Sequence, residues 1–157
     1  NSRSLVDLVF QDEILALIGS TERRGTHVAE MLATKVHFPV VSLCGTDPTI
    51  TEIPLPWIFC VASQTMTINP DFVRQYRERH ETEPDAYATL GFDAAALLAA
   101  RIRDGADTRI ALRNGLAAET WYQGVSGLFR FDSLGNRVEK SAGGLQARVA
   151  DTQNRQK

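Results

Sequence analysis

Two segments of the chain each pass from an apolar run, through a turn with a hydroxyl side chain, to the start of a helix. In the first, residues 15–18 lead into Ser20, and in the second, residues 39–43 lead into Thr46. If the two runs are neighbouring parallel strands, both hydroxyls lie at the carboxyl edge of an open sheet, where such sheets bind ligands. The amides at the adjacent helix starts favour an anion, for example a carboxylate. The pattern predicts a binding site and not a reaction centre.

The same polar residues have a second interpretation as helix caps. Ser, Thr and Asp at a helix start accept hydrogen bonds from the first free amides, and Ser20, Thr21 and Asp47 all stand at such positions. Pro48 fits the first turn of a short helix over residues 48–52. Taken alone, the residues favour capping over ligand contact.

No group of residues in the sequence is typical of an enzyme or of a metal site. His27, His37 and His80 are scattered, with no glutamate or cysteine at ligand spacing. Ser20 lacks the flanking pattern of a nucleophilic serine, and no glycine-rich phosphate loop with its lysine occurs. We therefore expect no catalysis, no metal and no cofactor.

Length and composition are those of one globular domain. The chain has 157 residues, of which 43% are hydrophobic and 23% charged, which suits a folded core. The net charge of -2 argues against nucleic acid as a partner. We find neither an apolar run long enough to cross a bilayer nor a secretory signal peptide in this chain.

The two cysteines, Cys44 and Cys60, are too few for a disulfide scaffold or a structural zinc site. We expect two buried thiols, with a disulfide between neighbouring strands as the alternative.

Hydrophobic periodicity and breakers predict alternating strands and helices, followed by a hairpin. The predicted strands are residues 14–18, 39–43 and 57–62, and the predicted helices are 4–10, 22–35, 48–52, 69–80, 86–104 and 110–117. Residues 63–68 read as a connector, and residues 128–132 with 137–138 as a β-hairpin. The β-α-β order implies parallel strands and a right-handed crossover.

The predicted fold class is therefore α/β, with an open, mostly parallel sheet and flanking helices. Residues 1–141 form a single lobe, and residues 142–157 form a tail that we expect to be partly disordered. Asp93 interrupts an alanine-rich apolar stripe, so we expect its carboxylate to bind a nearby backbone group.

Several blocks of the sequence resemble the type I periplasmic solute-binding proteins of branched-chain amino acid ABC transporters and the related receptor domains. The matching blocks lie in order along the chain and are residues 17–20 with 38–42, residues 45–51, residues 72–73 with 87–94, and residues 124–135. Members of this family have two α/β lobes hinged around a cleft. The resemblance implies one incomplete lobe of that fold.

The chain also departs from the family pattern. Residues 61–63 pass almost directly into residues 69–71, at the point where the family's chain would cross to its second lobe. The second lobe and the first strands of the first lobe are therefore expected to be missing. Cys60 stands where relatives often carry arginine.

By resemblance, Ser20 and Thr46 match the positions at which the family holds the carboxylate of an amino acid. The full set of implied ligand-binding residues is Ile18, Ser20, Thr21, Cys44, Gly45 and Thr46. The resemblance also implies a periplasmic or extracellular location and a membrane permease as partner. Without a second lobe, we expect weak binding of a small carboxylate or amino acid.

The alternative function is that of a structural or interaction module that binds no ligand. A shortened sheet leaves an exposed strand edge, which is a template for pairing with another chain. This interpretation predicts a homodimer.

Overall fold

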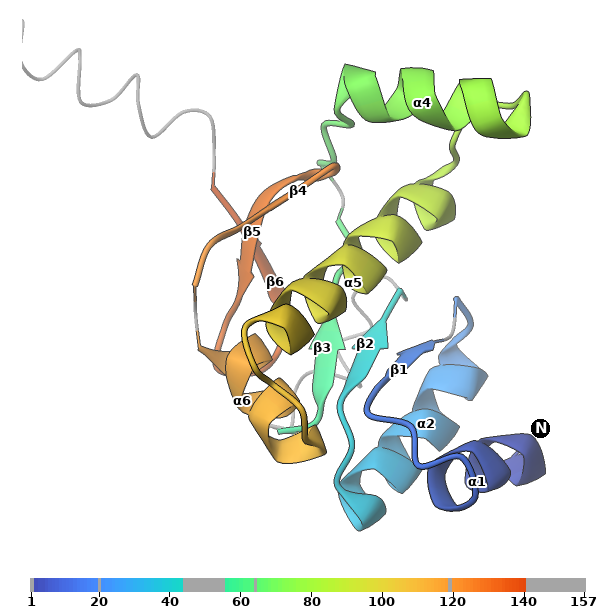
Figure 1. Cartoon of the computed structure of the whole chain (residues 1–157), viewed down its shortest axis with the longest axis vertical. Coiled ribbons are helices and arrows are strands. Elements are labelled where there is room, and N and C mark those ends of the chain that lie inside the picture. The colour runs from blue at the N-terminus through green and yellow to red at the C-terminus, as the bar shows by residue number, and fades with distance from the viewer. Residues whose placement is uncertain (1, 20, 44–55, 64, 119, 141–157) are drawn as a thin grey trace, which may run out of the picture.

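The computed structural model describes residues 2–19, 21–43, 56–63, 65–118 and 120–140. Figure 1 shows two small sheets that meet beside a long diagonal helix, with two N-terminal helices at the far side of the first sheet. The architecture is α/β, as the sequence predicts. None of the helices in these ranges is long and apolar enough to cross a membrane.

The first sheet is parallel and has the order β1-β2-β3. Its strands are β1 (Leu17–Gly19), β2 (Val40–Ser42) and β3 (Ile58–Cys60). The register pairs Ile18 with Val41 and Val41 with Phe59. Every residue of β2 and β3 is buried, as is typical of parallel strands that are covered on both faces.

The connection between β1 and β2 is the helix α2 (Arg23–Val36), so the predicted β-α-β unit is confirmed. It ends where His37 takes a left-handed conformation with φ of 57°, and the His37 amide donates to the Ala33 carbonyl. The preceding helix α1 (Ser2–Phe10) packs beside it. The predicted helix over residues 48–52 and the tail 142–157 lie outside the described residues.

Alternate residues of the parallel strands pack into two separate cores, because successive side chains point to opposite faces of the sheet. On one face, Val40 and Ile58 pack with α1 and α2. On the other, Val41 and Phe59 pack with the later helices and the second sheet. We call these the small core and the large core.

Three helices follow β3, namely α4 (Pro70–His80), α5 (Ala86–Arg103) and α6 (Arg109–Ala117). Each starts at a side-chain cap: Asn69 accepts from the Asp71 amide, Asp85 from the Ala88 amide and Thr108 from the Ala111 amide. Such caps satisfy amides that have no partner within the helix. The three predicted helices are confirmed to within one residue at each end.

The second sheet is antiparallel and consists of β4 (Tyr122–Gly124), β5 (Gly127–Phe131) and β6 (Arg137–Glu139). It contains the predicted hairpin, whereas β4 was not expected. The hairpin turn meets β3, since the Cys60 amide donates to the Gly135 carbonyl at 2.8 Å. Gly135 has φ of +79°, and a Cβ there would lie 2.1 Å from the Ile58 carbonyl oxygen, so only glycine fits.

The predicted strands are longer than the observed ones. Residues 14–18 were expected to pair, but β1 begins at Leu17, and β3 is half the length of the predicted run 57–62. Leu15 and Ala16 pack on the large core without joining the ladder. A run of apolar residues in the sequence indicates burial and not ladder hydrogen bonding, so it predicts strands that are too long.

Candidate functional site

The carboxyl ends of β1 and β2 meet at one edge of the parallel sheet. Gly19 is the register partner of Ser42, and the Leu43 amide donates to the Gly19 carbonyl at 3.1 Å. The condition for a shared site, two adjacent parallel strands in register, is therefore met. Of the predicted site residues, Ser20, Cys44, Gly45 and Thr46 lie outside the described residues.

The other two predicted site residues, Ile18 and Thr21, occupy different settings. Ile18 is the middle residue of β1, with 38% of its surface exposed. Thr21 is exposed and lies in the bend before α2. The N-cap residue of α2 is Glu22, so the expectation that Thr21 caps this helix is wrong. The Glu22 carbonyl instead accepts hydrogen bonds from the amide and from the hydroxyl of Thr26, at 3.0 and 3.1 Å.

Ser42 is the last residue of β2 and is buried at this edge of the sheet. It is 2% exposed, and its carbonyl accepts from the Val61 amide at 3.0 Å. On the neighbouring strand, Cys60 is buried as well, in accord with the expected thiol. Cys44, its suggested disulfide partner, is not among the described residues.

A polar cluster that sequence reasoning missed lies beside the carboxyl end of β3, and it centres on Arg137. The guanidinium donates to the Val61 carbonyl and to the Ser126 carbonyl, both at 3.1 Å, and to the Ser126 hydroxyl at 2.8 Å. It lies 4.2 Å from the centroid of the Phe129 ring. The Arg137 side chain is only 2% exposed. Burial is the main cause that lowers the pKa of Arg137, although nearby acidic groups oppose it.

Glu139 extends this cluster to the connector after β3. Its carboxylate pairs with Arg137 (Nε to Oε1, 2.9 Å) and accepts hydrogen bonds from the hydroxyls of Ser63 and Thr65. Burial by itself would raise the pKa of Glu139, but the two hydroxyls and the Arg137 charge outweigh it and lower the pKa. The contacts tie the connector to the second sheet.

Asp93 supports the same cluster from α5. It is fully buried and accepts from the amides of Val125 and Ser126, at 2.6 and 3.0 Å, and from the Ser126 hydroxyl. The prediction that this carboxylate binds a backbone group is confirmed. A Cβ at Gly124 would lie 2.5 Å from the Asp93 carboxylate, so this glycine is required for the close approach. The acid in an alanine-rich stripe was the one sequence signal for the cluster.

The histidines have local roles on helices. His27 pairs with Glu30 at 3.2 Å, His37 stacks on Trp57, and the His80 ring packs at a tilt against Tyr76. Burial raises the pKa of Glu30, and the interaction with His27 partly opposes that change. No group of three or more potential metal ligands occurs in the described part of the chain.

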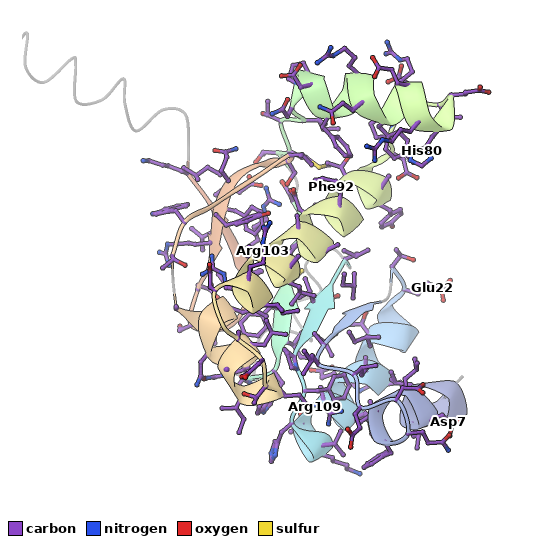
Figure 2. All side chains as sticks on the ribbon, viewed as in Figure 1. Asp7, Glu22, His80, Phe92, Arg103 and Arg109 are labelled. Atoms are coloured by element: carbon purple, nitrogen blue, oxygen red, sulfur yellow. The ribbon has the colours of Figure 1, made fainter. Side chains whose placement is uncertain are left out.

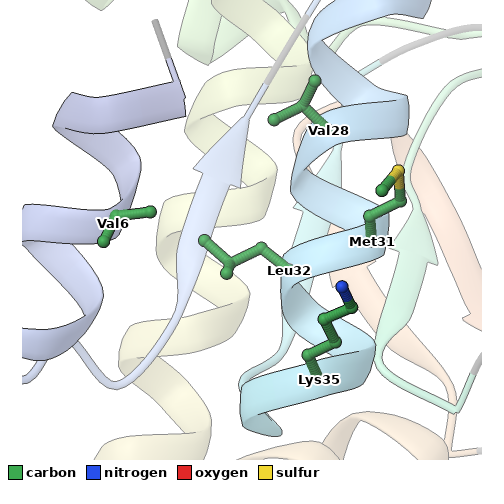
Figure 3. Close-up of a pocket in the computed structure, with 5 residues that line it drawn as sticks. All are labelled: Val6, Val28, Met31, Leu32 and Lys35. Atoms are coloured by element: carbon green, nitrogen blue, oxygen red, sulfur yellow. The ribbon is translucent and has the colours of Figure 1, made fainter.

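Two hollows in the described surface lie away from the predicted edge. One, of about 240 Å³, is an apolar groove between α1 and α2 that is lined by Val6, Val28, Met31, Leu32 and Lys35 (Figure 3). The other, of about 150 Å³, lies between α4 and α5, where Phe92 and His80 are labelled in Figure 2. Neither hollow contains a residue from the ends of β1 or β2.

Neither a family model nor a curated protein matches the sequence. Solved structures do match its fold, which is that of the periplasmic binding proteins. One is the branched-chain amino acid transporter substrate-binding protein LivJ from Streptococcus pneumoniae in complex with isoleucine. It has a TM-score of 0.77 at 15% identity, over 88% of this chain and 78% of that one.

A second is the leucine-binding protein LivK from Thermotoga maritima, with a TM-score of 0.74 at 12% identity and the same coverage of 88% and 78%. The chain is thus structurally similar to the substrate-binding proteins of branched-chain amino acid ABC transporters. Both neighbours are described as binding proteins. At these identities the likeness establishes the fold alone.

Proposed function

We propose that this chain is a non-enzymatic binding domain for a small carboxylate, such as a branched-chain amino acid, at the carboxyl edge of β1 and β2. The observation that supports the proposal is the parallel register of Gly19 with Ser42, because the two strands end at one edge and the hydroxyl-bearing segments follow these ends in the sequence. LivJ and LivK, the structural neighbours, are described as binding isoleucine and leucine.

The chemistry of this edge suits an anion. The helix α2 begins four residues after β1 and has no acidic residue in its first turn, although its N-cap residue is Glu22. Its sequence there, Arg23-Arg24, adds positive charge to the free amides of the helix start. Ser20 and Thr46 would donate hydroxyl hydrogen bonds to the carboxylate oxygens. Ile18, Thr21, Cys44 and Gly45 complete the proposed site.

Binding by this chain is expected to be weak. Each hydrogen bond at a water-filled edge nets about 0.5–1.5 kcal/mol. At about 1 kcal/mol each, three or four such bonds correspond to a dissociation constant in the low millimolar range. A periplasmic or extracellular location and a membrane permease as partner are part of the proposal by family resemblance, as is the single lobe over residues 1–141.

Titration followed by amide NMR tests the proposal. L-leucine and 4-methylpentanoate, which share a carboxylate and an apolar tail, should shift the amides around Ile18, Thr21 and Leu43 at millimolar concentration. 3-Methylbutylamine, which lacks the carboxylate, should not. The double variant Ser20→Ala and Thr46→Ala should abolish the shifts.

Thr34→Ala is the matched control, because Thr34 is an exposed hydroxyl in the C-terminal half of α2 that donates to the Glu30 carbonyl. It should leave the titration unchanged. Equal shifts from the amine and the carboxylate, or shifts that survive the double variant, would refute carboxylate recognition at this edge. Micromolar affinity in calorimetry would refute the expected weakness.

A further inference from the structure

The hollow between α4 and α5 is formed by one face of each helix. The side chains that α4 contributes recur at intervals of three and four positions, so they lie on the same side of the helix. They are Phe72, Gln75, Tyr76, Arg79 and His80. From α5 come Ala88 and Phe92, which are also four positions apart. The lining therefore belongs to two regular helices that Figure 1 shows side by side.

Aromatic rings line this hollow. The Phe72 ring packs at a tilt against Phe92 and against Tyr76, with ring centroids 4.9 and 5.8 Å apart. The His80 ring packs against Tyr76 with a centroid distance of 4.4 Å. Phe72 is buried, whereas Phe92 is 49% exposed, and Figure 2 labels Phe92 and His80 at the space between the two helices. Tilted rings present both faces and edges, which are the surfaces that a further aromatic ring contacts favourably.

The size of the hollow suits one six-membered ring. Its volume is about 150 Å³, and an apolar cavity of about 150 Å³ binds benzene. Ala88 has the smallest side chain in the lining, so a larger residue at this position would occupy part of the space. We therefore expect a ligand with a single ring.

The charges around the hollow favour an anionic group on that ring. Two arginines of α4 have acidic partners, since Arg74 pairs with Asp71 at 2.9 Å and Arg77 pairs with Glu83. Arg79, which lines the hollow, has no ion pair or hydrogen bond to any residue that the structure describes. None of the lining residues is acidic. A guanidinium at the rim can bind a carboxylate through charge-assisted hydrogen bonds.

We propose that the hollow between α4 and α5 binds a single-ring aromatic carboxylate, with the ring against Phe72, Tyr76 and Phe92 and the carboxylate at Arg79. The site contains no residue from the carboxyl ends of β1 and β2. It is therefore a second binding site, and it can be tested independently of the proposed function.

Titration with three small probes, followed by amide NMR, tests the ligand class. Benzoate should shift the amides around Tyr76, Ala88 and Phe92 at millimolar concentration. Acetate, which has the carboxylate without the ring, should leave these amides unchanged. Benzyl alcohol, which has the ring without the charge, should bind about fivefold more weakly than benzoate. Equal shifts from acetate and benzoate, or benzoate shifts confined to the ends of β1 and β2, would overturn the proposal.

A pair of arginine variants tests the role of the charge. Arg79→Gln should weaken benzoate binding about fivefold and leave benzyl alcohol binding unchanged. Arg74→Gln is the matched control, because Arg74 lies on the same helix, outside the lining, and pairs with Asp71. It should leave both titrations unchanged. Equal weakening of benzoate binding in the two variants would contradict a carboxylate site at Arg79.

Two further pairs of variants test the location. Ala88→Leu should fill the hollow and abolish the benzoate shifts, whereas Ala95→Leu, at an exposed position of α5 outside the lining, should not. Leucine is a strong helix former, so both variants should keep α5. Phe92→Ala should weaken benzoate binding about fivefold, and Tyr87→Ala, which removes a 50% exposed ring outside the lining, should not. Benzoate binding that survives Ala88→Leu, or equal losses in the two aromatic variants, would exclude this site.

Discussion

The two sheets differ in whether they enclose charged side chains. The antiparallel sheet encloses Asp93 and Arg137 in a network in which side chains bind the backbone of neighbouring turns. The parallel sheet has its backbone ladder and apolar side chains on both faces, and β1 and β2 end in register at Gly19 and Ser42. We therefore expect the network around Asp93 and Arg137, the closed region, to contribute more to stability than the carboxyl ends of β1 and β2, where we propose binding.

The comparison predicts that the largest loss of stability follows from breaking the closed network. Asp93→Ala leaves the Val125 amide and the buried amide and hydroxyl of Ser126 without this acceptor, and it should lower the free energy of unfolding by about 3 kcal/mol or more. Urea denaturation measures the change. Glu83→Ala removes an exposed partner of Arg77 and should cost about 0.5 kcal/mol or less. Similar losses for both variants would contradict the special role of the network.

A smaller effect is expected where α1 joins the rest of the molecule. Arg109 on α6 donates to the Ile14 carbonyl at 2.8 Å and to the Val9 carbonyl at 2.9 Å. Arg109→Ala should cost about 2 kcal/mol and speed amide exchange in α1 before the rest of the chain. Arg113→Ala is the control, since it removes hydrogen bonds to the Pro56 carbonyl and to the side chain of the adjacent Asn114. Uniform acceleration along the chain would mean that α1 is not a separate unit.

The pKa of Glu139 gives a further test of the closed region. Because this pKa is lower in the folded chain than in the unfolded one, Glu139 adds stability above its ordinary value of about 4.3, and this stability is lost as the pH falls through the folded pKa. Glu139→Gln should therefore cost about 1 kcal/mol at pH 7 and almost nothing below the folded pKa. A difference that is independent of pH would contradict this origin.

For Glu30 on α2, outside the closed region, we expect the opposite pH dependence of stability and the smallest effect of these predictions. Its pKa is raised by burial, so the ionised form is disfavoured in the folded chain, and stability is lost as the pH rises through the folded pKa. Glu30→Gln should be neutral or stabilising by about 0.5 kcal/mol or less at pH 7. Thermal unfolding at pH 4 and pH 7 measures this. A clear loss at pH 7 would show that the pair with His27 outweighs burial.

Periodicity, caps and turn residues were sufficient to predict the α/β class, the β-α-β unit, the helices α4, α5 and α6, and the hairpin. These features depend on local signals, such as Asp85 before an apolar stripe or the turn at Gly135. The same signals placed Ser20 and Thr46 after neighbouring strands, and the parallel register agrees with that order. Local sequence determines such features because they involve few residues that are close along the chain.

Strand length, the β4 strand and the Arg137 cluster were decided by tertiary structure alone. Arg137 contacts Val61, and Glu139 contacts Ser63, each across 76 positions of the chain, while Arg137 contacts Ser126 across 11 positions. No local pattern encodes such pairs, because their energy depends on burial and on the approach of backbone groups from distant segments. The sequence by itself determined which elements form and in what order. Packing decided where the charges are enclosed.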